Sequence, residues 1–281
     1  MPVFSTVPRH FFSSLAVAGS LLLAQSAMAQ DESSLQRIER TKVLRIGVIS
    51  GATPYFHKDL VKNEWQGFGP DFAQSLATKL GAKVERVETT WGNAVMDLQA
   101  NKIDVMFGMG PTPQRREMID FSDMLFNNTL TVVCKKGYPE VKTWEQLNDP
   151  SVKIVVDVGS NQDQFATKTL PKASIARLDS SGAASMAVQT GRADCQVLMV
   201  LLAQPLLAKR PDMGKMFVPE PVTTSTVHVG LRKSANKDLE NKVNEWIKQE
   251  RAAGEVQKVI VHNMEKLAGV KPESFPKQVK F

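Results

Sequence analysis

Short apolar runs alternate along this chain with segments in which apolar residues recur at helical spacing. The runs are typical of buried strands, and the periodic segments are typical of amphipathic helices. The predicted strands lie at 43–49, 83–89, 103–107, 129–134, 153–158, 173–178, 193–199 and 227–231. The predicted helices lie at 70–80 and 93–100, from 113 onward, from 161 through 165, and at 182–190, 237–252 and 255–267. This alternation predicts parallel α/β sheets, and its restart after Asp123 indicates two α/β units.

Two arginines, Arg115 and Arg116, fall in the first turn of one predicted helix. Thr112 suits its N-cap, and Pro113 suits its first helical position. A helix N-terminus carries partial positive charge, so a cation there is unfavourable by about 0.3–1 kcal/mol. Arg116 is interpreted as pairing with Asp120, which lies four residues later. Arg115 either pairs with a nearby acid or joins the helix N-terminus in binding a carboxylate or phosphate.

A second helix N-terminus follows the strand predicted at 153–158. Ser160 suits the N-cap, and Asp163 three residues later completes a capping-box pattern. In open α/β sheets, ligands bind outside the carboxyl ends of strands, near helix N-termini. The helices that begin near Arg115 and Ser160 both start at such strand ends. Two α/β units that face each other across a cleft would therefore hold one small anionic molecule from both sides.

The N-terminal residues 1–29 are predicted to be a secretory signal peptide. An apolar run follows Arg9, and an A-x-A cleavage signal stands at 27–29. We therefore expect an exported, periplasmic protein. In that oxidising compartment, Cys134 and Cys195 either form a disulfide or remain buried thiols, since each lies in an apolar strand-like run. We favour free thiols.

The charge distribution argues against nucleic acid as a partner. The formal net charge is +6 and the pI is about 9.2, but lysines and acids are interleaved along the chain. No basic block of five or more residues occurs. The histidines are scattered without metal-ligand spacing, so neither a metal nor another cofactor is expected.

Ordered motifs cover nearly the whole chain after residue 42. They are VLRIGV at 43–48, TPYF at 53–56, GFGPDFAQSLATKLGAKV at 67–84, Trp91, NKIDV at 101–105, TPQRREMIDFSD at 112–123, GSNQ at 159–162, TGRAD at 190–194 and VGLRK at 229–233. In this order they resemble family 3 of the bacterial extracellular solute-binding proteins, which serve polar amino acid-type ABC transporters. The resemblance implies a type II periplasmic binding protein with two α/β lobes, 30–127 plus 225–281 and 128–224. Hinges near 127–128 and 223–226 would let the lobes close on the solute.

The resemblance also implies a ligand site and no catalytic residues. The implied ligand-binding residues are Trp91, Gly110, Arg115, Asp157, Ser160, Asn161 and Gln162. Arg115 would clamp the solute carboxylate, which favours the anion-binding alternative for this side chain, and Gly110 would offer backbone groups. Ser160 and Asn161 would donate to the same carboxylate from the second lobe. Trp91 would form a wall of the site, or it is a core or lobe-surface tryptophan.

One position departs from the family pattern. Members usually carry an aspartate about eight residues after the TGR-type glycine, where it holds the solute ammonium. Counted from Gly191, that position is Met199, whose thioether cannot neutralise a buried cation. Either the solute lacks an α-amino group or Asp157 replaces the missing acid. Asp157 suits equally well the role of a cap on the helix that follows Ser160.

These features predict a binding protein and not an enzyme. We expect a monomeric periplasmic component that captures a small carboxylate-bearing solute and delivers it to an inner-membrane ABC permease. The alternative is a secreted enzyme on the same scaffold, similar to the cyclohexadienyl dehydratases that act on prephenate-like carboxylates. The segment SNQDQF at 160–165 is similar to theirs. The second-lobe glutamate that such enzymes carry falls at Leu202, which weighs against the alternative.

Overall fold

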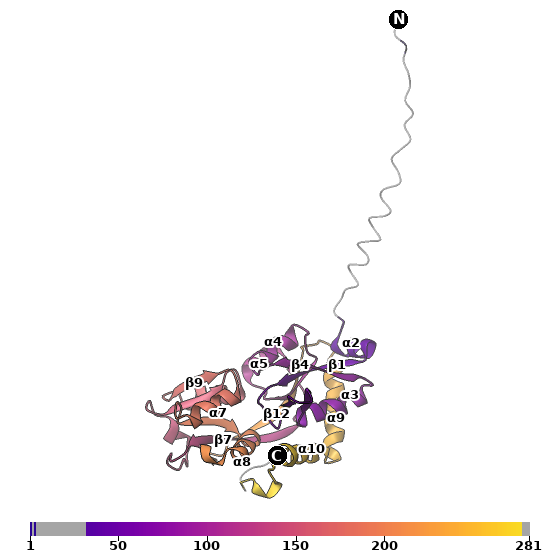
Figure 1. The fold of residues 1–281 in the computed structure, drawn as a ribbon. Coiled ribbons are helices and arrows are strands. Elements are labelled where there is room, and N and C mark those ends of the chain that lie inside the picture. Colours follow the sequence, from indigo (N-terminus) through magenta and orange to yellow (C-terminus); the bar gives the residue numbers. More distant parts are fainter. Residues whose placement is uncertain (2, 4–31, 277–281) are drawn as a thin grey trace.

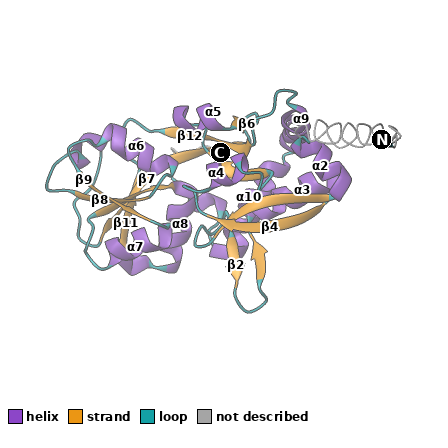
Figure 2. Ribbon diagram, turned by 90° about the horizontal axis from the view of Figure 1, so that it is seen from above, coloured by secondary structure: helices purple, strands orange, loops and turns teal. Residues whose placement is uncertain are grey.

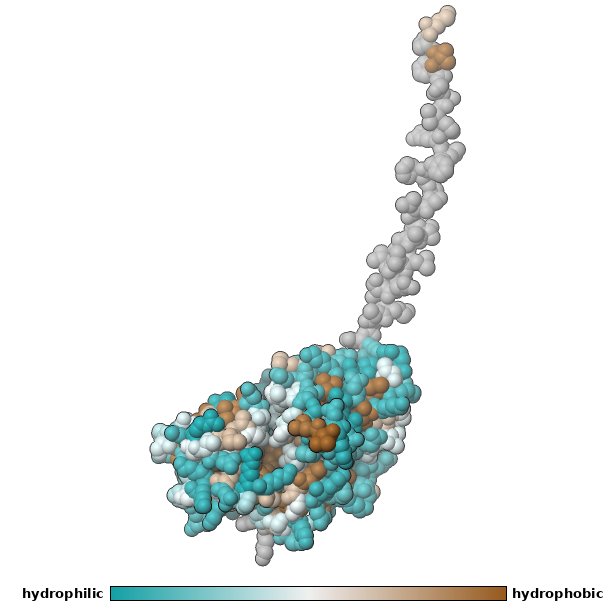
Figure 3. All heavy atoms as spheres, viewed as in Figure 1, coloured by the Kyte–Doolittle hydropathy of each residue, from teal (hydrophilic) through white to brown (hydrophobic). Residues whose placement is uncertain are grey.

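Two α/β lobes lie side by side in the computed structural model, which describes residues 1, 3 and 32–276 (Figure 1). Apart from two positions, the predicted signal peptide at 1–29 lies outside the described residues. The two-lobed α/β fold predicted from the sequence is confirmed. Among the described helices, none combines the length and apolar character needed to cross a membrane. The face of the molecule seen in Figure 3 is mostly hydrophilic.

The first lobe is built on a sheet in the order β4-β1-β5-β12. Its strands are β1 (Val43–Ile49), β4 (Lys83–Thr89), β5 (Val105–Met109), β12 (Thr224–Leu231) and the short β6 (Asp120–Phe121). Its helices are α2 (Ser34–Thr41), α3 (Phe68–Lys79), α4 (Ala94–Gln99), α5 (Pro113–Met118), α9 (Asp238–Ala252) and α10 (Glu255–Ala268). A hairpin of β2 (His57–Asp59) and β3 (Glu64–Gln66) projects from this lobe (Figure 2). Aromatic rings fill the core, where Trp246 meets Phe72 and Phe107 edge to face.

The second lobe continues the sheet in the order β7-β10-β8-β9, with β11 on the other side of β7. Its strands are β7 (Phe126–Lys135), β8 (Lys153–Asp157), β9 (Ser174–Leu178), β10 (Cys195–Met199) and β11 (Gly214–Phe217). Its helices are α6 (Asn161–Thr169), α7 (Ser181–Gln189) and α8 (Val200–Lys209). Three short 3₁₀ turns lie at Trp144–Leu147, Pro211–Met213 and Pro272–Ser274.

Two antiparallel strands cross between the lobes. Residues 224–227 of β12 pair with residues 126–129 of β7. At the two ends of this segment, Thr224 stands opposite Thr129 and Val227 stands opposite Phe126. Beyond this segment, β12 pairs with β5 in the first lobe and β7 pairs with β10 in the second. The crossing strands contain residues 127–128 and 224–226 of the segments that the sequence suggested as hinges, while Thr223 precedes β12. The exact lobe boundaries at 127/128 and 224/225 stay a prediction.

The interpretation that Arg116 pairs with Asp120 is wrong. Helix α5 ends at Met118, so Asp120 belongs to β6 and the helical four-residue spacing does not apply. Asp120 instead forms an ion pair with Lys237, whose Nζ atom lies 2.6 Å from the Oδ2 atom of Asp120. The Arg116 guanidinium lies over the Phe121 ring, 5.5 Å from its centroid.

The expectation of free thiols is also wrong, because Cys134 and Cys195 form a disulfide. They stand directly opposite each other in the antiparallel pair of β7 and β10, with Cα atoms 4.0 Å apart. The two residues are 61 positions apart in sequence, so only the strand register reveals their proximity. Disulfides persist in oxidising compartments, which agrees with export.

We expect the disulfide to stabilise the second lobe substantially. Closing a loop of 61 residues restricts the unfolded chain by about 4 kcal/mol in the chain-entropy model. The double variant Cys134→Ser, Cys195→Ser should therefore unfold at lower urea concentration than the oxidised protein. Reductant should shift the wild-type transition and leave the double variant unchanged. Equal transition midpoints for wild type and variant would contradict a stabilising role.

Candidate functional site

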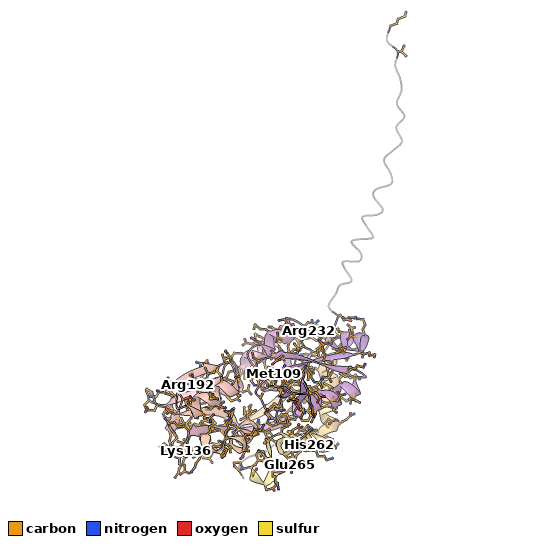
Figure 4. The ribbon with its side chains drawn as sticks, in the orientation of Figure 1. Met109, Lys136, Arg192, Arg232, His262 and Glu265 are labelled. Atoms are coloured by element: carbon orange, nitrogen blue, oxygen red, sulfur yellow. A yellow bond between two sulfur atoms is a disulfide. The ribbon has the colours of Figure 1, made fainter. Side chains whose placement is uncertain are left out.

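Arg115 is placed at the junction of the lobes by the turn between β5 and α5. In the view of Figure 4, Met109 at the end of β5 lies between Arg192 on one lobe and Arg232 on the other. The Thr112 hydroxyl accepts the backbone N–H of Arg115 at 3.3 Å, and Pro113 opens the helix, as the sequence predicts. Arg115 is only 4% exposed. The cap and the strand end therefore fix a guanidinium in a buried position.

The buried guanidinium of Arg115 binds oxygens of both lobes and no carboxylate among the described residues. One Nη donates to the Gly110 carbonyl at 3.1 Å and to Asn161 Oδ1 at 3.0 Å. The other Nη donates to the Gly159 carbonyl at 2.9 Å. Burial lowers the pKa of Arg115 to about 10. Neutral oxygens replace part of its hydration and leave its charge uncompensated.

Glycines allow the two lobes to approach closely around this arginine. A Cβ on Gly110 would stand 1.5 Å from the Nδ2 atom of Asn161, and one on Gly159 would stand 2.9 Å from the Cα of Gly92. The Asn161 amide also donates to Ser225 Oγ in β12 at 3.2 Å. A side chain at Gly110 would therefore hold the lobes apart unless Asn161 moves.

A first cavity, here called the arginine cavity, lies beside these contacts and has a volume of about 20 Å³. Its lining residues are Tyr55, Trp91, Gly108, Gly110, Arg115, Ser160, Asn161, Gln162, Met199, Leu202 and Val227. Arg115 is the only charged residue among them. A cavity of this size holds about one water molecule, so a solute needs the lobes to separate first.

The arginine cavity brings together six of the seven residues implied by the sequence: Trp91, Gly110, Arg115, Ser160, Asn161 and Gln162. Ser160 caps α6 by accepting the N–H of Asp163 at 3.1 Å, which leaves its own hydroxyl hydrogen able to donate. Met199 also lines the cavity, at the end of β10. The position at which the family resemblance implies an ammonium-binding aspartate therefore lies in the cleft.

A second cavity, here called the acidic cavity, contains Asp157 and has a volume of about 10 Å³. Its lining residues are Ile49, Ser50, Gly51, Ala52, Trp91, Asp157, Val158, Asp179, Ser180 and Ser181. Trp91 lines both cavities, so the two share this residue. Asp157 does not cap α6, because its side chain accepts the Ser181 hydroxyl at the start of α7.

Asp157 is a buried acid with an incomplete set of partners. It is 4% exposed, and its Oδ1 atom has no hydrogen-bond partner among the described residues. Burial raises the pKa of Asp157 to about 6, although the Ser181 hydroxyl opposes the shift. The carboxylate therefore destabilises the folded protein at neutral pH.

Tyr55 was not identified as a site residue from sequence, although it lies in the quoted TPYF segment. Its hydroxyl accepts from the Asn128 amide of β7 at 2.5 Å, and burial raises the pKa of the phenol. Its ring meets Trp91 edge to face, with centroids 6.3 Å apart. Tyr55 thus connects the crossing strand to the wall of the arginine cavity.

The two crossing strands and the interlobe cleft are those of a type II periplasmic binding protein, and this protein has that fold. The chain belongs to the bacterial extracellular solute-binding proteins, family 3, whose model matches residues 44–265.

Individual relatives include both binding proteins and an enzyme. The L-arginine-binding protein of Pseudomonas aeruginosa is 28% identical, over 83% of this chain and 92% of its own length. Cyclohexadienyl dehydratase of the same organism is 27% identical, over 76% of this chain and 79% of its own length. Among solved structures, the ancestral amino acid-binding protein AncCDT-1, a precursor of cyclohexadienyl dehydratase, matches with 34% identity and a TM-score of 0.74. It aligns with 84% of this chain and 100% of its own.

We expect the variant Asp157→Asn to be more stable than wild type at neutral pH. The folded pKa of about 6 exceeds the ordinary value of 3.8, so the folded state binds the proton more tightly. Stability contributed by Asp157 is therefore lost as pH rises between these values. The advantage of Asn should be about 3 kcal/mol at pH 7 and less than about 1 kcal/mol at pH 4. Urea unfolding at both pH values measures it.

Asp212→Asn is the matched control, because Asp212 is exposed in the second lobe and lines neither cavity. Its stability should stay close to that of wild type at both pH values. A loss of stability in Asp157→Asn at pH 7 would contradict an uncompensated buried carboxylate.

Proposed function

We propose that the protein is the periplasmic substrate-binding component of an ABC transporter. It captures a small carboxylate-bearing solute between its lobes and delivers it to an inner-membrane permease. The protein acts as a monomer and carries out no reaction on the solute. The disulfide between Cys134 and Cys195 supports an oxidising compartment. The relatives of this chain include arginine- and cystine-binding proteins, which supports an amino acid-like solute.

The observation that carries this proposal is the buried, uncompensated charge of Arg115. Its guanidinium faces a cavity and is bound only by neutral oxygens among the described residues. A planar guanidinium matches a carboxylate bidentately, and such charge-assisted hydrogen bonds are about twice as strong as neutral ones. A solute carboxylate would replace the Gly159 and Asn161 oxygens and compensate the charge. Residues of both lobes would then contact one ligand.

A secreted dehydratase is the second candidate, because one relative is a cyclohexadienyl dehydratase. That chemistry needs a general acid in the cleft. Leu202, at the position where such an enzyme is expected to carry glutamate, presents an apolar side chain to the arginine cavity. Asp157 is the candidate general acid, since burial raises its pKa to about 6 and so favours the protonated carboxyl group. Incubation with prephenate and analysis of the products separates the candidates: product formation that Asp157→Asn abolishes would support the enzyme.

We expect Arg115→Ala to abolish detectable binding of the carboxylate solute identified in a thermal-shift panel of amino acids, amino-acid derivatives and organic acids. Losing a bidentate partner of a desolvated carboxylate costs about 2–5 kcal/mol, which weakens affinity at least about 30-fold. Arg116→Ala is the control, because Arg116 is exposed and lies on Phe121 outside the cavity. Calorimetry should show wild-type affinity for Arg116→Ala. Unchanged affinity in Arg115→Ala would disprove the clamp.

We expect Gly110→Ala to fold normally but to bind the same solute at least about tenfold more weakly. A loss of about 1.4 kcal/mol in the free energy of lobe closure suffices for this tenfold change in affinity. Its Cβ would collide with the Asn161 amide and oppose closure. Small-angle scattering should show that saturating solute reduces the radius of gyration of wild type more than that of Gly110→Ala. Adding Asn161→Ala removes the colliding amide and should restore compaction. Equal compaction of wild type and Gly110→Ala would exclude closure at this contact.

A further inference from the structure

The acidic cavity has the composition of a site for a positively charged group. Two carboxylates, Asp157 and Asp179, and the indole of Trp91 line it, while no lysine, arginine or histidine does. Asp179 is exposed, whereas Asp157 is 96% buried and one of its oxygens has no partner among the described residues. The unpartnered oxygen belongs to a residue that lines the cavity, and the atom itself is buried. An ammonium or guanidinium group would satisfy this oxygen and meet the aromatic face.

The arginine cavity has the opposite character and disfavours a cation. Its only charged lining residue is Arg115. Met199 also lines it, and α8 begins at the next residue without a side-chain cap. The free N–H groups at this helix start add partial positive charge near Met199. An ammonium held beside the bound carboxylate would therefore meet positive potential and a thioether.

The two cavities are neighbours along one short stretch of chain. Arg115 donates to the carbonyl of Gly159, and Asp157 lies two residues before that glycine. Two residues span at most about 7.2 Å between Cα atoms. One small molecule that passes Trp91 can therefore reach both side chains once the lobes separate.

We propose that the solute carries its positive charge at the end remote from its carboxylate, as an ω-amino or ω-guanidino acid does. Its carboxylate binds Arg115, its apolar chain passes Trp91, and its cationic nitrogen binds Asp157 in the acidic cavity. This inference rests on the proposed function and assigns Asp157 as the residue that selects the solute. An α-amino group contributes nothing to binding, because the arginine cavity offers it no acid.

Calorimetry with three matched compounds tests the position of the charge. 6-Aminohexanoate carries only the terminal ammonium, L-lysine adds an α-ammonium, and hexanoate has neither. We expect 6-aminohexanoate to bind at least ten times more tightly than hexanoate and no more weakly than L-lysine. The shorter 4-aminobutanoate and 5-aminopentanoate determine which chain length fits. 5-Guanidinopentanoate against L-arginine repeats the comparison for a guanidinium.

Asp157→Asn tests the residue assigned to the cation. It should weaken 6-aminohexanoate at least tenfold while changing hexanoate by less than threefold. Asp212→Asn should leave both affinities unchanged. Circular dichroism checks that each variant is folded. Retained affinity of Asp157→Asn for the ω-amino acid that binds wild type would overturn the assignment.

The same measurements separate a failure of this inference from a failure of the proposed function. If hexanoate and 6-aminohexanoate bind equally and Arg115→Ala abolishes both, the carboxylate site stands and the inference is wrong. If L-lysine binds and 6-aminohexanoate does not, an α-ammonium is required and the inference is again wrong. If no panel compound binds in an Arg115-dependent manner, both the inference and the proposed function are wrong.

Discussion

The closed arrangement of this protein depends on how the buried guanidinium of Arg115 is satisfied. A desolvated cation needs partners, and here they come from both lobes: the Gly110 carbonyl on one side, and the Gly159 carbonyl and Asn161 amide oxygen on the other. The same hydrogen bonds therefore satisfy the N–H donors of the guanidinium and hold the lobes together, while its charge stays uncompensated. A carboxylate that enters the cleft competes for these bonds and offers stronger ones, so solute binding and lobe closure depend on one side chain.

The topology explains why these groups meet. Strands β5, β8 and β10 end at the cleft, and α5, α6 and α8 begin there. Helix starts provide unpaired N–H groups, while strand ends deliver side chains such as Asp157 and Met199 to fixed positions. The crossing strands β7 and β12 join the lobes through a short paired segment, and Asn128 within it binds Tyr55 of the cavity wall. The crossing strands and the site are thus physically connected.

Local signals in the sequence predicted the elements that position the site. They could not predict the register between strands that are distant in sequence. The limits of β1 and β4 and the caps Thr112 and Ser160 follow from apolar runs and capping chemistry, which act over a few residues.

Helix α8 was not predicted, because Pro205 lies inside an apolar run that lacks a helical face. The disulfide was missed because only the register of β7 and β10 brings Cys134 opposite Cys195. Arg116 was misassigned because the four-residue spacing to Asp120 assumes a continuing helix, whereas α5 ends at Met118.

Two opposite charges remain uncompensated in neighbouring cavities, and this arrangement has a direct physical consequence. Arg115 and Asp157 do not form an ion pair, since they line different cavities and each side chain binds only neutral groups among the described residues. Each charge by itself disfavours the folded, closed state, as the pKa shifts of both groups toward their neutral forms indicate. A simple carboxylate would compensate one charge and leave the other buried. A molecule with an anionic and a cationic end would compensate both at once, so closure would be most favourable around a zwitterion whose charges match this separation.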